Sequence, residues 1–179
     1  VTSEAYPLIK TGGLGDICGS LPPALQALGV DLRLLLPAYR DARARAGRLR
    51  PVARLQLADD EATVLEGRLP GTRIALWLVD HPAYDRPGNP YHDPQGQPWP
   101  DNAARYALLA RAACALALGQ AGLAWRPDVV HGHDWQTGLI PALLALEPRR
   151  PATVFTIHNL AYQGIFPAAA FAALKLPPA

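Results

Sequence analysis

A lysine and three glycines lie close together near the start of the chain, where residues 10–16 form the sequence Lys-Thr-Gly-Gly-Leu-Gly-Asp. Tandem glycines let the backbone approach a ligand closely, and the helix predicted to follow presents unpaired N–H groups to an anion. Lys10 can add a positive charge for a phosphate. The segment lacks the Gly-Lys-Ser/Thr ending of a P-loop, and its glycine spacing is not that of a dinucleotide-binding loop. Taken alone, the motif favours a purely structural bend, and an anion site needs support from other segments.

A second polar segment, residues 131–135, follows an apolar run and has the sequence His-Gly-His-Asp-Trp. In open α/β sheets, ligands bind outside the carboxyl ends of strands. Two imidazoles and a carboxylate also suggest a metal, but His131 and His133 point the same way only if the strand continues, and no third ligand cluster is evident. We therefore expect no metal site. Taken singly, His131 is expected to be a buried histidine bonded to backbone, and Asp134 offers a helix cap.

The third polar segment, residues 158–164, follows the apolar run 154–157 and has the sequence His-Asn-Leu-Ala-Tyr-Gln-Gly. Side chains that donate and accept hydrogen bonds beside an aromatic ring are typical of a sugar-binding cleft. Asn159 is also a common turn residue, so a purely structural role for it stays open.

A fourth candidate is the proline- and glycine-rich stretch 81–100, which has no usable periodicity. Its mixture of aromatic and polar side chains at residues 84–93 suits a carbohydrate surface, and it suits an inert excursion equally well. Loops of this length in a compact domain are usually functional or disordered.

The elements that must position these segments alternate between apolar extended runs and helical stretches, which predicts an α/β fold with a mainly parallel sheet and helices on both faces. Val1 and Thr2 are the expected tail of a first strand. A helix is expected over 14–28, with Pro22 and Pro23 near its start or kinking it, and Gly29 as its stop. The further expected elements are a strand at 31–37, strand-like segments at 51–57, 62–69 and 72–80, a helix from 102 to about 120, a strand at 128–131, a helix at 135–146, a strand at 153–157 and a small final helix.

Two details of this pattern carry more specific predictions. Pro70 and Gly71 predict a turn, so the segments around it are expected to form an antiparallel hairpin or a sheet edge. Asp101 and Asn102 offer an N-cap to the long helix.

The composition bounds the class of protein. With 179 residues the chain is long enough for a hydrophobic core in one domain, and 50% hydrophobic residues with a net charge of +2 give no reason to expect disorder, nucleic-acid binding or membrane binding. Cys18 and Cys114 are far apart and are expected to be buried and unpaired. No signal segment or membrane span is evident, so we expect a soluble, cytoplasmic protein. The absence of methionine and the abrupt ends suggest part of a longer polypeptide.

Taken together and in order, the motifs resemble the N-terminal region of bacterial glycogen synthases and plant starch synthases. The resemblance runs from Val1 to about Pro167. Each motif alone is only suggestive, whereas the whole set of motifs in this order is specific for the family. It is carried by residues 3–7, 10–16, 84–87, 90–91, 133–135 and 156–164.

The resemblance implies one lobe of a retaining, two-lobed GT-B glycosyltransferase that moves glucose from ADP-glucose to the non-reducing 4-hydroxyl of an α-1,4-glucan. The implied catalytic residues are His158, Asp134 and Glu4. The implied donor-binding residues are Lys10, Gly12, Gly13 and Asp16, and the implied sugar-binding residues are Tyr91 and Asn159. ADP-glucose is a substrate, and no cofactor or metal is implied.

The implied mechanism stabilises an oxocarbenium-like sugar and a departing diphosphate. We expect same-face attack in which the leaving phosphate accepts the acceptor's proton, so neither Asp134 nor Glu4 is assigned as a covalent nucleophile. The second Rossmann-like lobe of the family is absent from residues 1–179, and we therefore predict that this partial N-terminal catalytic domain is inactive alone.

Two alternatives stay open. One is a related glucosyltransferase that makes sucrose-type or trehalose-type products, because glycine loops of this kind serve many sugars. The other is a non-catalytic glucan-binding module.

Overall fold

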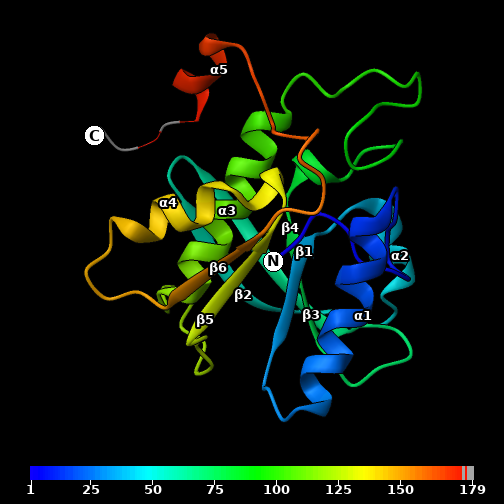
Figure 1. The fold of residues 1–179 in the computed structure, drawn as a ribbon, viewed down its shortest axis with the longest axis vertical. Coiled ribbons are helices and arrows are strands. Elements are labelled where there is room, and N and C mark those ends of the chain that lie inside the picture. The colour runs from blue at the N-terminus through cyan, green and yellow to red at the C-terminus, as the bar shows by residue number, and fades with distance from the viewer. Residues whose placement is uncertain (175, 177–179) are drawn as a thin grey trace.

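The computed structural model describes residues 1–174 and 176, which form an α/β fold in which helices pack around two groups of strands (Figure 1). The helices are α1 (Gly13–Ala27), α2 (Arg40–Arg45), α3 (Asn102–Ala117), α4 (Leu139–Ala145) and α5 (Ala168–Ala173). The strands are β1 (Arg33–Pro37), β2 (Arg50–Leu57), β3 (Asp60–Arg68), β4 (Ala75–Asp80), β5 (Val129–His133) and β6 (Ala152–Thr156). Short 3-10 helices cover Pro82–Tyr84 and Trp135–Thr137.

The strands form two groups that residues 1 and 2 connect. One sheet has the order β1-β4-β3-β2 and the other pairs β5 with β6. The Thr2 N–H donates to the Leu35 carbonyl at 3.0 Å, while the His133 N–H donates to the Val1 carbonyl at 3.2 Å. The expected tail of a first strand therefore lies between β1 and β5, although only these two residues occupy that place.

The strand pairs on either side of this junction are parallel, and the antiparallel pairs lie farther from it, beyond β4. β1 is parallel to β4, and β5 is parallel to β6, while β2, β3 and β4 form an antiparallel meander. The predicted hairpin and the turn at Pro70 and Gly71 are confirmed, and Gly71 adopts a φ of +74° there. The apolar runs in β1 and β4 are buried, as expected for strands covered on both faces.

Several boundaries differ from the predictions. Pro22 and Pro23 lie well inside α1, so they do not mark its start. The long helix ends at Ala117 because Gly119, with a φ of +75°, turns the chain and its N–H bonds the Leu116 carbonyl. The short helix α2 was not predicted.

The predicted cap of α3 is wrong in its chemistry. Asp101 occupies the N-cap position, but its side chain makes no cap hydrogen bond. Both carboxylate oxygens instead accept from Arg86, at 2.8 and 2.6 Å. A bidentate ion pair outcompetes the single bond that a cap would provide.

The two cysteines are buried and unpaired, as predicted. Within residues 1–174 and 176, no helix has the length and apolar character needed to cross a membrane.

Candidate active site

Loops that follow the parallel strands meet at one edge of the sheet, where the sequence predicted a site (Figure 1). Residues 3–12 follow the first two residues, 81–101 follow β4, Asp134 follows β5, and 157–166 follow β6. Because parallel strands end at a common edge, segments that are distant in sequence come together there.

Glu4 holds the glycine loop, residues 10–15, in place through hydrogen bonds from Thr11. Its carboxylate is buried and accepts hydrogen bonds from the Thr11 N–H and, at 2.8 Å, from the Thr11 hydroxyl. The Tyr6 N–H donates to the Gly15 carbonyl at 2.9 Å, which ties the other end of the loop. These contacts hold the bend at the start of α1 in one shape.

The outer face of the same loop is open. Gly12 and Gly13 are exposed, and a Cβ atom added at either position would meet no other atom within 4 Å. Helix α1 begins at Gly13, and its N-cap residue Gly12 provides no side-chain hydrogen bond to the first N–H groups of the helix. Such a bend can receive an anion.

Lys10 and Asp16 form an ion pair beside the bend. The Lys10 Nζ lies 2.7 Å from an Asp16 carboxylate oxygen, and both side chains are about half exposed. The Lys10 stem lies against Gly15, where an added Cβ would come within 3.0 Å of it. An exposed pair of this kind contributes little stability, so Lys10 can exchange Asp16 for another anion at small cost.

Tyr91 connects the long loop to Glu4. Its hydroxyl donates to Glu4 and lies 2.8 Å from the Ser3 Oγ. Burial raises the pKa of Tyr91 well above its ordinary value, so the phenol stays protonated and keeps donating. The long loop therefore reaches the glycine loop through a single hydrogen-bond network.

The loop 81–100 is held by specific side-chain to backbone bonds. Arg105, buried inside α3, donates to the carbonyls of Ala83 and Pro90, both at 2.9 Å. Asn89 accepts from the N–H groups of Tyr91 and His92, both at 2.8 Å. The loop is irregular in backbone but held in one arrangement by these bonds, and that arrangement places Tyr91.

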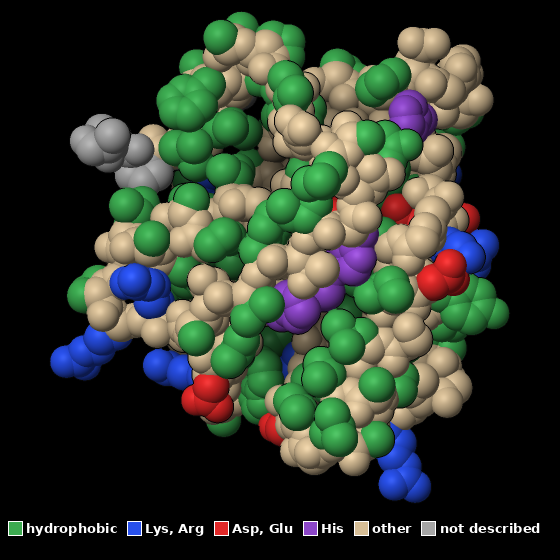
Figure 2. All heavy atoms as spheres, viewed as in Figure 1, with side chains coloured by type: hydrophobic (Ala, Val, Ile, Leu, Met, Phe, Trp, Pro, Cys, Tyr) green, Lys and Arg blue, Asp and Glu red, His purple; other side chains and the backbone are tan. Residues whose placement is uncertain are grey.

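Three histidines form a row at the carboxyl ends of β5 and β6. The ring centroids of His131 and His133 are 4.1 Å apart, and those of His133 and His158 are 5.3 Å apart. The His133 Nδ1 and His158 Nε2 lie 3.0 Å apart and share a hydrogen bond. In Figure 2, histidine side chains gather in a short band near the centre of this face. Strand β5 continues through His133, so the two histidines do point the same way.

His131 differs from its prediction. Its side chain is half-buried, and its Nε2 lies 2.7 Å from the hydroxyl of Thr156 rather than from a backbone group. Among residues 1–174 and 176, no three histidine, cysteine or acidic side chains are arranged to hold a metal ion.

Two of the three histidines, His131 and His133, have lowered pKa values. Burial lowers the pKa of His133 to about 3, with smaller effects from the Val1 amino group and the other two imidazoles. Burial also lowers the pKa of His131. At neutral pH His133 is therefore a neutral hydrogen-bonding partner for His158.

Asp134 positions His158 and does not cap the next helix. Its Oδ1 accepts from the His158 N–H at 2.7 Å, and its own side chain makes no cap bond. Asp134 has a φ of +58°, which is strained for a residue with a side chain. The Asp134 N–H donates to the Thr156 carbonyl at 2.9 Å, and this bond and the His158 bond hold the residue in that conformation.

The loop after β6 rests on Trp135. An added Cβ at Gly164 would lie 2.5 Å from the Trp135 ring, so only glycine permits this approach. Asn159 accepts from the Ala161 N–H at 2.9 Å and forms a turn. The structural role left open for Asn159 is therefore present, and its proposed sugar contact stays a prediction.

The predicted site residues thus form two groups. Glu4, Lys10, Gly12, Gly13, Asp16 and Tyr91 belong to the glycine-loop network, whereas Asp134, His158 and Asn159 belong to the ends of β5 and β6. Sequence analysis missed Ser3, Thr11, Thr156 and Trp135 as their partners. The position of Thr11 inside the glycine motif could have indicated its role in holding the loop. The contacts of the other three residues depend on tertiary packing and have no local signal.

The architecture, with parallel strands whose following loops meet at one edge, is that of a Rossmann-like lobe of the GT-B fold. The solved catalytic domain of starch synthase IV from Arabidopsis thaliana, bound to ADP and acarbose, is similar with a TM-score of 0.75 and 27% identity. The similarity covers 98% of this chain and 36% of that chain.

The chain belongs to the starch synthase catalytic domain family, which it matches over residues 1–179. It is 58% identical over 179 residues to glycogen synthase 1 of Methylococcus capsulatus and 58% identical over 181 residues to the glycogen synthase of Cellvibrio japonicus. Each alignment covers 99% of this chain but only 36% and 38% of the relatives, so the chain spans little more than a third of their length. The resemblance predicted from the motifs is confirmed.

Proposed function

We propose that the protein to which this chain belongs transfers glucose from ADP-glucose to the non-reducing end of an α-1,4-glucan, with retention of configuration. The observation that carries this proposal is the open glycine bend at the start of α1, which is fastened by Glu4 and has Lys10 beside it. Membership of the starch synthase family supports the choice of donor and acceptor.

In this proposal the glycine loop receives the donor's diphosphate. The backbone N–H groups at Gly12 and Gly13 approach the phosphates, and Lys10 leaves Asp16 to add its charge. Before the donor binds, the ion pair with Asp16 keeps Lys10 close to the loop. This arrangement stabilises the charge that develops on the leaving diphosphate.

The reacting sugar is proposed to lie against His158. Tyr91 and Asn159 line the sugar subsites in this proposal, and the neutral His133 orients the His158 ring through their shared hydrogen bond. Fixed polar groups of this kind stabilise an oxocarbenium-like sugar without reorganisation.

Neither carboxylate is proposed as a covalent nucleophile. Both Glu4 oxygens accept hydrogen bonds, from Thr11 and Tyr91, and Asp134 is occupied by the His158 N–H. We therefore assign Glu4 and Asp134 as positioning residues within the catalytic cleft. The leaving phosphate is the proposed acceptor for the proton of the attacking 4-hydroxyl.

The proposed enzyme needs a second lobe, which would face this edge of the sheet and hold much of the nucleotide. Residues 1–179 alone are accordingly proposed to be inactive. The proposal includes no cofactor, no metal, no nucleic-acid or membrane partner, and a cytoplasmic location.

The direct test uses the full-length protein with ADP-[14C]glucose and glycogen, and measures label in ethanol-precipitated polymer. Parallel reactions use UDP-glucose as donor, and fructose or glucose 6-phosphate as small acceptors. Label in polymer from ADP-glucose is expected. Label in polymer only with UDP-glucose would contradict the proposed donor. Label found only in the ethanol-soluble product of a small acceptor would support the sucrose-type or trehalose-type alternative.

A further inference from the structure

A groove lies at the edge of the sheet opposite the proposed site. It has a volume of about 660 Å³, within the range of about 300–1,000 Å³ typical of small-molecule sites. The parallel strands β1 and β4 begin at the groove, at Arg33 and Ala75, whereas the loops of the proposed site follow the carboxyl ends of the parallel strands. The groove is therefore separated from the glycine loop by the length of these strands.

Positive charge is concentrated in this groove. Its charged lining residues are five arginines and two carboxylates, Arg33, Arg48, Arg50, Arg68, Arg73, Asp31 and Glu66. They give the groove a net charge of +3, which exceeds the +2 of the whole 179-residue chain. The remainder of the chain is thus close to neutral, and its excess positive charge lies here.

The strand register places several of these side chains on one face of the sheet. Arg68 of β3 lies opposite Ala75 of β4, and Ala75 lies beside Arg33 of β1. Glu66, two residues before Arg68 and so on the same face, lies opposite Arg50 of β2. The small Ala75 leaves open space between two arginine positions that are two strand spacings, about 10 Å, apart.

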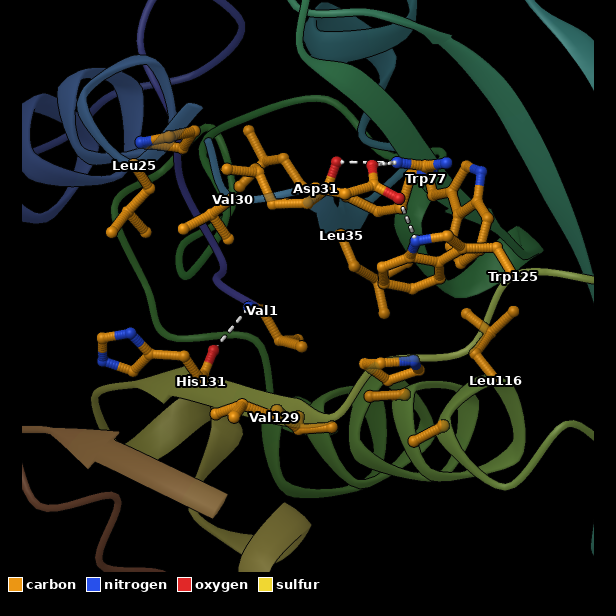
Figure 3. A pocket seen from close by; sticks show the side chains of 18 of the residues that line it. Val1, Leu25, Val30, Asp31, Leu35, Trp77, Leu116, Trp125, Val129 and His131 are labelled. Carbon is orange, nitrogen blue, oxygen red and sulfur yellow. Dashed lines mark hydrogen bonds and ion pairs between the residues drawn. The ribbon is translucent and has the colours of Figure 1, made fainter. Parts of the chain in front are cut away.

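Both carboxylates of the groove already hold hydrogen-bond donors. Asp31 accepts from Arg33 and, at 2.8 Å, from the Trp125 indole, and Figure 3 shows the bond to the indole beside the neighbouring apolar cavity. Glu66 accepts from its register partner in β2 and, at 3.2 Å, from the Trp77 indole. Each of the four carboxylate oxygens thus has a donor, and none of these donors belongs to the other three arginines of the groove.

Those three arginines differ from the others in the same part of the chain. Residues 33–86 contain ten arginines, and seven of them pair with a carboxylate. The other three, Arg48, Arg68 and Arg73, pair with no carboxylate among residues 1–174 and 176, and all three are exposed in the groove. Like charges gathered at one hollow without acidic partners attract an anion.

We infer that this arginine groove is a second binding site, which takes a small molecule with two or more phosphate groups, such as a sugar bisphosphate or a nucleoside triphosphate. A guanidinium group matches a phosphate through two parallel hydrogen bonds, and three guanidinium groups exceed what one phosphate needs. The aliphatic side chains of Leu32, Ala46 and Ala75 line the groove between the charges and would contact the carbon skeleton of the ligand. The inference is independent of the proposed glucosyl transfer.

The test measures binding to the full-length protein by isothermal titration calorimetry at physiological ionic strength, about 0.15 M. The probes are fructose 1,6-bisphosphate and ATP, which distinguish a sugar from a nucleotide ligand, and fructose 6-phosphate, which carries one phosphate. We expect at least one of the first two probes to bind, and fructose 6-phosphate to bind at least about tenfold more weakly because it has one phosphate fewer.

A double variant, Arg48→Gln with Arg73→Gln, removes two of the free guanidinium groups. Arg68 is kept because it also donates to the Arg73 carbonyl, at 3.3 Å. The matched control, Arg40→Gln with Arg54→Gln, removes the same charge from two exposed arginines outside the groove. We expect the groove variant to weaken binding at least about tenfold and the control to change it less than about twofold, since only the first loses phosphate contacts.

Melting curves check that each variant folds, and Arg73→Gln against Arg54→Gln gives the same comparison if a double variant unfolds. Equal weakening in the groove variant and its control would indicate general attraction of anions and would overturn the inference. Absence of binding by both multiply phosphorylated probes, or equal affinity for fructose 6-phosphate, would also overturn it.

Lys10→Ala separates this site from the donor site. Binding in the groove is expected to survive this change within about twofold, because Lys10 lies at the other edge of the sheet. Binding that Lys10→Ala abolishes and the groove variant preserves would assign the probe to the glycine loop. That result would overturn the present inference and leave the proposed function standing.

Discussion

The two halves of the proposed site are built differently. The glycine loop is tied down by the buried Glu4, the Thr11 hydroxyl and the Tyr91 phenol, so its shape is fixed before any ligand arrives. The loop after β6 rests mainly on Trp135 and leaves Leu160, Tyr162 and Ile165 exposed, at 74%, 68% and 84%.

On the sugar side, the hydrogen bonds that fix the chain are concentrated at His158. His158 itself is fixed by Asp134 and His133 at the strand ends, although the residues after it are exposed. We infer that at the diphosphate end the glycine-loop backbone is preorganised and only Lys10 must change partner, whereas on the sugar side only the histidine is held in place. The predictions below test that difference, beginning with the largest expected effect.

In the full-length enzyme, His158→Ala is expected to lower kcat by about 100-fold, because a fixed polar group at the developing charge is lost. Leu160→Ala, in the same loop but exposed, is expected to change kcat less than about twofold. Steady-state kinetics with ADP-glucose and glycogen, together with a melting curve for each variant, provide the measurement. Equal loss in both variants would mean that the whole loop is preorganised.

Gly164→Ala tests how firmly the same loop is held by Trp135. Gly164 and Gly47 both have positive φ angles, +63° and +71°, but only at Gly164 would a Cβ collide with a ring. Gly47→Ala is expected to cost about 1 kcal/mol of backbone strain, and Gly164→Ala about 2 kcal/mol or more because steric overlap adds to it. Urea unfolding of the two variants measures the difference, and equal losses would show that the loop moves away from Trp135 freely.

Lys10→Ala tests the diphosphate end. Loss of one charged contact is expected to lower kcat/KM for ADP-glucose about tenfold and to leave the apparent affinity for glycogen unchanged. Arg54→Ala, which removes an exposed cation paired with Glu61 in the β2–β3 hairpin, is the control and should change neither. If Lys10→Ala weakens glycogen and donor use equally, the lysine supports the fold and not the donor.

The smallest expected effect concerns pH. The folded pKa of His133, about 3, lies below its unfolded value of 6.5, so the neutral form is favoured in the folded state. Its stabilising contribution is complete above pH 6.5 and is lost as the pH falls from 6.5 toward 3. Between pH 7 and 6 this loss is about 0.7 kcal/mol.

Urea unfolding at the two pH values measures this slope. His133→Asn should flatten it, whereas His92→Gln, outside the histidine row, should preserve it. An unchanged slope in His133→Asn would show that His133 is not held neutral by its surroundings.

The sequence predicted the elements whose pattern is local. The apolar runs of β1, β4 and β5 and the long α3 follow directly from periodicity and from turn residues such as Pro70 and Gly71. The helix α2 was missed because it is short and charged, and Ala42 is the one buried residue within it.

The site was predictable as a set of segments but not as a set of contacts. The carboxyl ends of strands pointed to Asp134 and His158, and the tandem glycines pointed to the bend. Nothing local indicates that Arg105, in an otherwise apolar helix, turns inward to hold the long loop, or that Arg86 removes Asp101 from its cap. Those outcomes depend on which segments the fold brings together.

The most direct test of the central claim is a crystal structure of the full-length protein with ADP-glucose or ADP. The account predicts diphosphate oxygens within hydrogen-bond distance of the Gly12 or Gly13 N–H, and the Lys10 Nζ moved from Asp16 to a phosphate. A diphosphate bound elsewhere, with the Lys10–Asp16 pair intact and the bend empty, would contradict it.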